Sequence, residues 1–289
     1  MSVVNPLVTV TAAPTARRGG ALGLLRGTGA AGMASAVVIA AATIFALIGP
    51  LVAPYQLTPN ISLTFVGPSG GHLLGFDFEG RDVLSRLLVS AQSSMLGPLA
   101  VVAGAMVAGT LIAVVAAWYR GAVDGVLSSA LDVLFAFPGI LLAVLAAAVF
   151  GSGLLTPATA LAIAYMPYVG RVLRGAALRE RSQPYVAALE VQGASATSIC
   201  LRHIVPNIMP LIVAQATIMF GYAMVDIAAV SFLGFGPTDT WGFMISENQI
   251  GIPQGYPLPA LAAGACIVAV VIAFNVLGER LFEQAQAGR

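Results

Sequence analysis

Charge is what this sequence lacks most. Only 9% of its 289 residues are charged, whereas an ordinary soluble domain is about 25% charged. Hydrophobic residues make up 58% of the chain, and its mean hydropathy is +0.93. A chain this apolar could neither cover a water-facing surface nor stay disordered. The composition therefore excludes a soluble globular protein and indicates an integral membrane protein.

Basic stripes, cysteine clusters and a signal peptide are missing as well. All 13 basic residues are arginines, and they form no stripe of the kind that a nucleic-acid partner needs. The two cysteines, Cys200 and Cys266, fall in a polar loop and in an apolar helix, so we expect no disulfide framework and no metal site. Residues 1–30 lack the pattern of a cleavable signal peptide and predict a flexible cytoplasmic tail.

Long apolar runs, by contrast, are abundant. A bilayer core about 30 Å thick needs about 20 apolar residues in a helix. Six stretches qualify, at roughly 33–53, 95–118, 127–150, 154–173, 208–233 and 259–278. They are continuous rather than alternating, which favours helices over the strands of a barrel. We therefore expect an all-α integral membrane fold with six transmembrane helices in residues 31–282, followed by a short cytoplasmic tail at 283–289.

The arginines predict the orientation of these helices. With the N-terminus inside, eleven of the 13 arginines lie on the cytoplasmic side, and only Arg81 and Arg86 lie outside. Both termini are then cytoplasmic. Within the first outer connection, the apolar residues that follow Asp82 fall on one helical face. Segment 77–94 is therefore predicted to be a short amphipathic helix on the outer surface.

The longest cytoplasmic connection, 181–207, has the pattern of two short helices joined at a glycine. Pro184 suits the first turn of one helix, and Gly193 suits a left-handed stop. A second helix over 196–204 is expected to break at Pro206. Because this element has no core of its own, we expect another chain to bind it.

The motifs of the chain, taken in order, resemble one family of transporters. The loop reads Tyr185-Val186-x-Ala188-x-x-x-x-Gly193-Ala194-Ser195 and then Arg202-His203-Ile204-x-Pro206-Asn207. This pattern is similar to the coupling loop of binding-protein-dependent ABC importer permeases. More narrowly, it resembles the C-type permease subunit of dipeptide, oligopeptide and nickel importers. Further matches in the family's order are Gly80-Arg81-Asp82, Asp132 through Pro138, Arg171 with Arg174, and Ser231 through Gly236.

The resemblance implies a type I ABC importer permease fold in the bacterial plasma (inner) membrane. The implied partners are a homologous second permease, an extracellular solute-binding protein, and two cytoplasmic ATPase subunits or one fused ATPase. Those ATPases would bind ATP and Mg²⁺. This chain contains no Gly-x-x-x-x-Gly-Lys-Ser/Thr phosphate loop, so we expect it to bind no cofactor and to be no enzyme. Its expected function is to couple ATP hydrolysis to alternating access for short peptides.

Three groups of residues are candidate sites. The resemblance assigns contact with the ATPases to Tyr185, Ala188, Glu190, Gly193, Ala194, Ser195, Arg202, His203, Pro206 and Asn207. Contact with the second permease or the binding protein is expected from Gly80, Arg81, Asp82 and Arg86. Asp132 and Asp226 lie in apolar stretches, where acids are costly and usually functional. Asp226 could attract the ammonium end of a peptide or help to close a gate, whereas Asp132 is expected to lack a basic neighbour that is common in the family.

Other functions remain open at this point. The nearest is a nickel or other small-solute permease of the same architecture, although two histidines far apart in sequence disfavour a dedicated metal path. An intramembrane serine protease would need a serine and a histidine within reach, and Ser195 and His203 are the superficial candidates. Ser195 lies in a polar loop, which is the wrong place for such a nucleophile. A stand-alone secondary transporter is disfavoured because paired broken helices are not evident.

Overall fold

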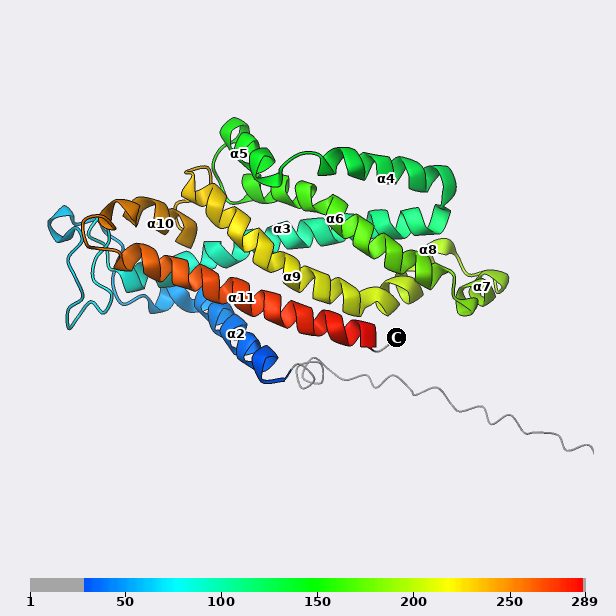
Figure 1. Ribbon diagram of the computed structural model, residues 1–289, viewed down its shortest axis with the longest axis horizontal. Helices are drawn as coiled ribbons and strands as arrows, with labels where there is room; N and C mark the ends of the chain where they lie inside the picture. The colour runs from blue at the N-terminus through cyan, green and yellow to red at the C-terminus, as the bar shows by residue number, and fades with distance from the viewer. Residues whose placement is uncertain (1–28, 288–289) are drawn as a thin grey trace, which may run out of the picture.

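The computed structural model describes residues 29–287, and its regular elements are helices. The long helices run side by side along the longest axis of the molecule (Figure 1). They are α2 (Gly29–Val52), α3 (Val83–Tyr119), α6 (Leu155–Arg181), α9 (Val205–Phe232) and α11 (Leu258–Ala287). The shorter ones are η1 (Ile61–Leu63), α4 (Gly121–Phe135), α5 (Gly139–Phe150), α7 (Pro184–Val191), α8 (Ala196–Ile199), η2 (Cys200–Ile204), α10 (Trp241–Asn248) and η3 (Gln249–Gly251). The predicted tail at 1–30 lies almost wholly outside the described residues.

Four to five helical spans are long and apolar enough to cross a membrane within residues 29–287. Four of them are α2, α3, the continuous run of α8, η2 and α9, and most of α11. The pair α4 and α5 makes a fifth if it is counted as one bent span. The sequence predicted six, and the remaining one is α6. This helix carries a run of charged residues from Arg171 to its end, which lowers its hydropathy.

The predicted outer surface helix is part of a longer helix. Residues 83–94 continue without a break into the predicted span, so that α3 is 37 residues long. Asp82 caps its N-terminus by accepting a hydrogen bond from the amide of Ser85. α10 contacts α3, and the indole of Trp241 on α10 donates to the carbonyl of Leu87 in this first part at 3.0 Å. The expectation of a separate short helix was wrong, because residues 83–94 are the first turns of α3.

The predicted single span at 127–150 is also interrupted. α4 ends at Phe135 and α5 begins at Gly139, and their axes are bent by 76°. Pro138 stands directly before α5 and has no N–H group to continue the helical ladder. α11 continues to Ala287, into the segment predicted as the C-terminal tail.

Close helix packing depends on small residues. α3 packs chiefly against α6, and α11 packs against α9 and α2. A Cβ added to Gly109 on α3 would lie 2.6 Å from the Cγ1 of Val169 on α6. One added to Gly278 on α11 would lie 2.9 Å from the backbone nitrogen of Ile218 on α9. Small side chains therefore let these backbones approach, as in other membrane helices.

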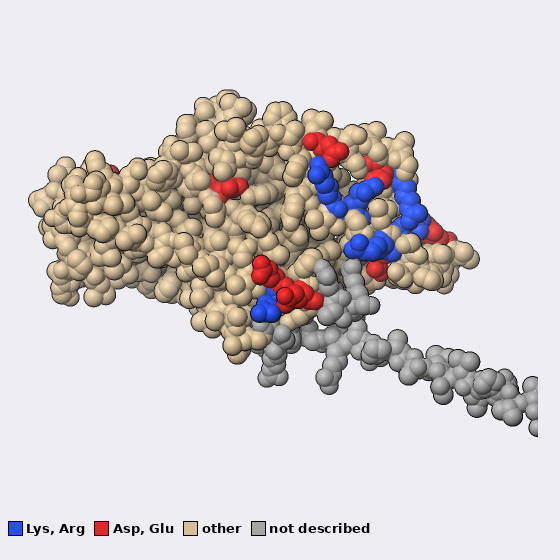
Figure 2. Space-filling model, viewed as in Figure 1, with Lys and Arg blue, Asp and Glu red and all other residues tan. Residues whose placement is uncertain are grey.

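On the face drawn in Figure 2, charged side chains gather toward one end. Figure 2 shows arginines and acids clustered on the part of the visible face that contains α7 and α8 in Figure 1. The middle of this face carries few charges, which are one acid near its centre and a small group at its lower edge (Figure 2). A middle with few charges is what the hydrocarbon core of a bilayer requires. The fold thus separates a charged end, an apolar middle and an opposite end formed by α10 and the loop before α3.

Candidate functional site

The connection between α6 and α9 is a compact helical element at the charged end. α7 begins with Pro184 in its first turn and ends before Gly193, whose φ is 78°. The amide of Ala194 donates to the carbonyl of Leu189 at 3.0 Å, and that of Gly193 donates to Glu190 at 3.0 Å. These two bonds form the Schellman motif that ends helices at a left-handed glycine. The turn predicted at Gly193 is therefore present.

Three polar side chains tie this element to its flanking helices. The hydroxyl of Tyr185 on α7 donates to Oε1 of Glu180 on α6 at 2.8 Å. The amide nitrogen of Asn207 on α9 donates to the same oxygen at 2.8 Å and lies 3.2 Å from the Tyr185 hydroxyl. Burial, together with the bond to Glu180, raises the pKa of Tyr185 to about 12. Its hydroxyl is therefore a proton donor at neutral pH, and α7 is fixed to both α6 and α9.

The outer face of α7 is small and apolar. Val191 is 90% exposed, and Ala188 is exposed as well. Nothing lies within 4 Å of a Cβ added to Gly193. On the inner side, Val186 and Ile199 are fully buried. α7 thus packs with one face on its own chain and presents an uncovered apolar face at the tip, which is typical of an interaction site.

The remaining predicted loop residues have local contacts. Ser195 caps α8 by accepting from the amide of Ser198 at 3.3 Å, and the exposed Arg202 belongs to the following turn. The ring of His203 lies 6.3 Å from that of Tyr185. Within residues 29–287, Ser195 and His203 share no hydrogen bond. Their placement gives the serine protease alternative no support.

The break predicted at Pro206 does not occur. α8, η2 and α9 form one helical run over Ala196–Phe232. η2 is a single turn of π-helix, in which the amide of Val205 donates to the carbonyl of Cys200. The wider turn is directly followed by Pro206 in the first turn of α9, where a missing N–H is tolerated.

Sequence reasoning overlooked the charged end of α6. Arg181 pairs with Glu190 on α7 at 2.6 Å, and its guanidinium lies 4.2 Å from the centre of the Trp118 ring on α3. Glu180 holds Tyr185 as described above. From the sequence, Arg181 counts only as a marker of the cytoplasmic side, and Glu180 has no predicted role. The available signal was the alternation of Arg and Glu in the last turn of the helix, directly before the loop.

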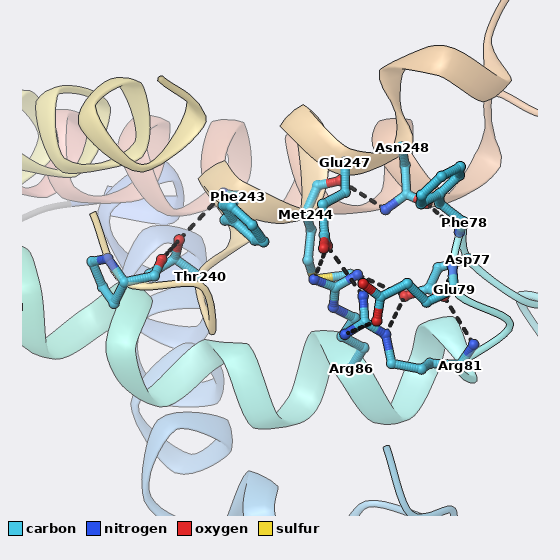
Figure 3. A network of polar contacts seen from close by, with 11 residues as sticks. Asp77, Phe78, Glu79, Arg81, Arg86, Thr240, Phe243, Met244, Glu247 and Asn248 are labelled. Atoms are coloured by element: carbon cyan, nitrogen blue, oxygen red, sulfur yellow. Dashed lines mark hydrogen bonds and ion pairs between the residues drawn. The ribbon is translucent and has the colours of Figure 1, made fainter. Parts of the chain in front are cut away.

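A second polar network lies at the opposite end, between α3 and α10 (Figure 3). Asp77 is fully buried and accepts hydrogen bonds from Nε of Arg81 at 2.9 Å and from Arg86 at 2.6 Å. Both arginines also pair with Glu247 on α10. The amide of Phe78 donates to Oδ1 of Asn248 at 2.9 Å. Asp77, Glu247 and Asn248 were not among the predicted site residues. Glu247 and Asn248 lie on α10, which is distant in sequence, whereas Asp77 lies only three residues before the predicted Gly80.

The four residues predicted to contact partners at this end mostly make contacts within this chain instead. Arg86 and Asp82 are each 3% exposed. Asp82 caps α3 and contacts Nδ1 of His72 at 2.8 Å. Gly80 has a φ of 70°, and a Cβ there would lie 1.8 Å from the carbonyl oxygen of Asn60. Arg81 is the most accessible of the four, so a contact between this group and another protein would depend on Arg81.

The two intramembrane acids lie in different surroundings. Asp132 pairs with Arg171 of α6 at 2.6 Å, and both side chains are exposed. Asp132 was expected to lack a basic neighbour, but Arg171 of α6 provides one. Asp226 on α9 accepts a hydrogen bond from the hydroxyl of Tyr165 on α6 at 2.6 Å. Asp226 also lines a hollow of about 550 Å³ beside the break between α4 and α5, which Asp132 does not.

Comparisons with known proteins agree on one family. The model of the family described as "Binding-protein-dependent transport system inner membrane component" matches residues 105–285. A dipeptide transport system permease protein of Alkalihalophilus pseudofirmus is 34% identical over 250 residues, which cover 85% of this chain and 82% of that protein. Glutathione transport system permease proteins of Escherichia coli O157:H7 and Shigella sonnei are 38% identical over 258 residues, covering 86% of this chain and 84% of each protein. The resemblance seen in the sequence is confirmed, and the chain belongs to the binding-protein-dependent transport system inner membrane components, as a permease subunit of an ABC importer.

Proposed function

We propose that this subunit moves short peptides into the cell and that α7 transmits the ATPase cycle to its transmembrane helices. The observation that carries this proposal is the α7 element itself. It is tied to α6 and α9 by Glu180, and it presents an uncovered apolar face at Val191. A rigid element with one free face can bind another protein and transmit that protein's movement to the two long helices α6 and α9.

The proposed membrane arrangement has six spans in a permease domain of residues 31–282. The bent pair α4 and α5 is one span, and α6 is another despite its charged end. Both termini and α7 lie in the cytoplasm, because this orientation places eleven of the 13 arginines inside. α10 and the loop before α3 then face the outside, where Arg81, as the most accessible of the four predicted residues, is the candidate for contact with a binding protein or a second permease.

The proposed partners follow from the family. A second, homologous permease completes the translocation path, and an extracellular binding protein delivers the solute. ATPase subunits, which carry ATP and Mg²⁺, bind the tip of α7. Closure of those subunits around ATP would favour one orientation of the permease pair by binding it preferentially, which is how a ligand shifts such an equilibrium.

Short peptides are the proposed substrates because the relatives named above transport a dipeptide and glutathione. A nickel or other small-solute permease of the same architecture is the second candidate. The difference is testable with the assembled transporter, because binding proteins of this class select the solute before it reaches the permease.

A co-purification experiment tests the proposed partners. The tagged chain is extracted from its own membranes in mild detergent, and the proteins that accompany it are identified by mass spectrometry. Val191→Asp places a charge on the tip of α7, while Ile250→Asp is a matched change at the other end of the chain, where the side chain is 51% exposed. We expect Val191→Asp to lose the ATPases and keep the second permease, and Ile250→Asp to keep both. If Val191→Asp retained its ATPases, or if the unaltered chain purified alone, the proposal would fail.

A further inference from the structure

A hollow in the middle of the molecule is lined by aromatic rings and one acid. Its walls come from the break between α4 and α5, from α6 and from α9. Its volume of about 550 Å³ falls within the range of small-molecule sites. The aromatic and acidic residues that line it are Phe135, Phe137, Tyr165, Tyr168, Tyr222 and Asp226. We call this hollow the tyrosine pocket.

Asp226 has an unused acceptor in this pocket. The hydroxyl of Tyr165 donates to its Oδ2 at 2.6 Å, a length typical of an O–H donor on a carboxylate. Among the described residues 29–287, its other oxygen has no hydrogen-bond partner, and the side chain forms no salt bridge. An acid placed in a transmembrane helix without a cationic partner is expensive and marks a functional position.

The aromatic walls favour one kind of guest. Tyr168 on α6 and Tyr222 on α9 are about half exposed and line the same pocket as the Asp226 carboxylate. The faces of such rings attract ammonium groups, and a carboxylate among them adds a direct charge partner. An anionic solute would be repelled by Asp226, and a lone carboxylate offers too few ligands to hold a divalent metal ion.

We propose that the tyrosine pocket binds the ammonium group of the solute during translocation, with Asp226 as its counter-ion. The inference rests on the proposed function, since it places the pocket on the path of the peptide. It adds to that function the chemical class that the permease itself recognises, which is a primary ammonium on a small organic solute. Tyr165 acts as a positioning residue, because its hydroxyl fixes one oxygen of the carboxylate and leaves the other for the guest.

Protection of an introduced cysteine tests this assignment without the need for transport. In the assembled transporter, with Cys200 and Cys266 replaced by alanine, Ile140→Cys puts a thiol on the pocket wall. Leu145→Cys is the control, because it lies on the same helix α5 and outside the pocket. The rate of reaction with a neutral maleimide is measured with glycinamide or with N-acetylglycinamide at neutral pH. Glycinamide carries a primary ammonium group at neutral pH, whereas in N-acetylglycinamide that nitrogen is part of a neutral amide.

The expected result is that glycinamide slows labelling at Ile140→Cys and leaves Leu145→Cys unaffected, while N-acetylglycinamide slows neither. Asp226→Asn should raise the glycinamide concentration needed for half-protection about tenfold, as expected for loss of a charge-assisted bond. Asp226→Glu keeps the charge and should retain most of the protection. Equal protection by both probes, or unchanged protection in Asp226→Asn, would overturn the assignment.

The two proposals fail separately. ATP-dependent uptake of a dipeptide by the unaltered transporter, without glycinamide protection at Ile140→Cys, would remove the pocket and leave the proposed function standing. Protection that depends on Asp226 in a transporter that moves no peptide would leave the pocket and remove the proposed substrate.

Discussion

Removal of the Tyr185 hydroxyl is expected to loosen α7 without unfolding the long helices. Tyr185→Phe deletes the 2.8 Å bond to Glu180 and also the contact with Asn207. A hydrogen bond to a charged group contributes about 1.5–3 kcal/mol. Glu180 is half-buried and Asn207 is exposed, so the lower end of that range applies, at about 1.5 kcal/mol. This corresponds to an increase of about tenfold in the population with α7 released.

Hydrogen exchange of the α7 amides measures this directly, because local opening determines their rates. We expect the amides of α7 in the purified transporter to exchange about tenfold faster in Tyr185→Phe. Those of α3 should be unchanged. Glu180→Ala removes both bonds to the carboxylate and should have a larger effect. Ser182→Ala is the matched control, because that exposed hydroxyl bonds only to carbonyls of its own helix end.

The functional result should follow the structural one. A loosened α7 transmits less of the ATPase movement, so uptake per ATP hydrolysed should fall in Tyr185→Phe while ATP hydrolysis persists. If α7 exchanged at the same rate in Tyr185→Phe and in the unaltered chain, the network would not hold α7. Equal loosening by Ser182→Ala would refute the reasoning in the same way.

Three further predictions concern stability and the turn after α7. Arg86→Met removes one of the two arginines that pair with Asp77 and Glu247, while Arg81 still pairs with both. Loss of its charged hydrogen bonds should destabilise the chain by about 1.5–3 kcal/mol, measured as folded protein remaining after heating in detergent, whereas Arg280→Met, at an exposed pair, should change little. Gly109→Ala should destabilise the packing of α3 on α6, because the added Cβ would lie 2.6 Å from the Cγ1 of Val169. Gly125→Ala on α4 is the control, since its Cβ would meet open space, and in the same assay it should leave stability unchanged or raise it. Gly193→Ala should lower the free energy of opening α7 by about 1–2 kcal/mol, because an alanine is strained at a φ of 78° even though its Cβ would meet no neighbour. Unchanged hydrogen exchange of the α7 amides would contradict this prediction.

The local structure of the loop was readable from the sequence. Pro184 at the start of α7 and Gly193 at its end act through their own backbone preferences, which do not depend on the rest of the fold. The helical character of the long apolar runs was readable for the same reason. Pro206 is the exception, because a single π-turn before it allowed the helix to continue.

Contacts between distant segments were not readable. The amphipathic pattern after Asp82 fits a membrane surface as well as it fits a protein neighbour, and only the position of α10 decides between them. Arg86 and Glu247 are 161 residues apart. Glu180 and Asn207 are 27 residues apart, on either side of the loop, and neither stands out by composition. The acid Asp226 was identified as a candidate, but Tyr165 and Tyr168 come from α6 and required the fold, whereas Tyr222 lies four residues before Asp226 on α9.

The most direct test of the central claim is uptake by purified components. This permease, its co-purified second permease and the ATPases are reconstituted into proteoliposomes, and a labelled dipeptide is added with the binding protein. The account predicts uptake that requires both ATP and the binding protein and that is lost in Val191→Asp. Active ATP hydrolysis without uptake of a dipeptide or of glutathione, or uptake that does not need the ATPases, would contradict it.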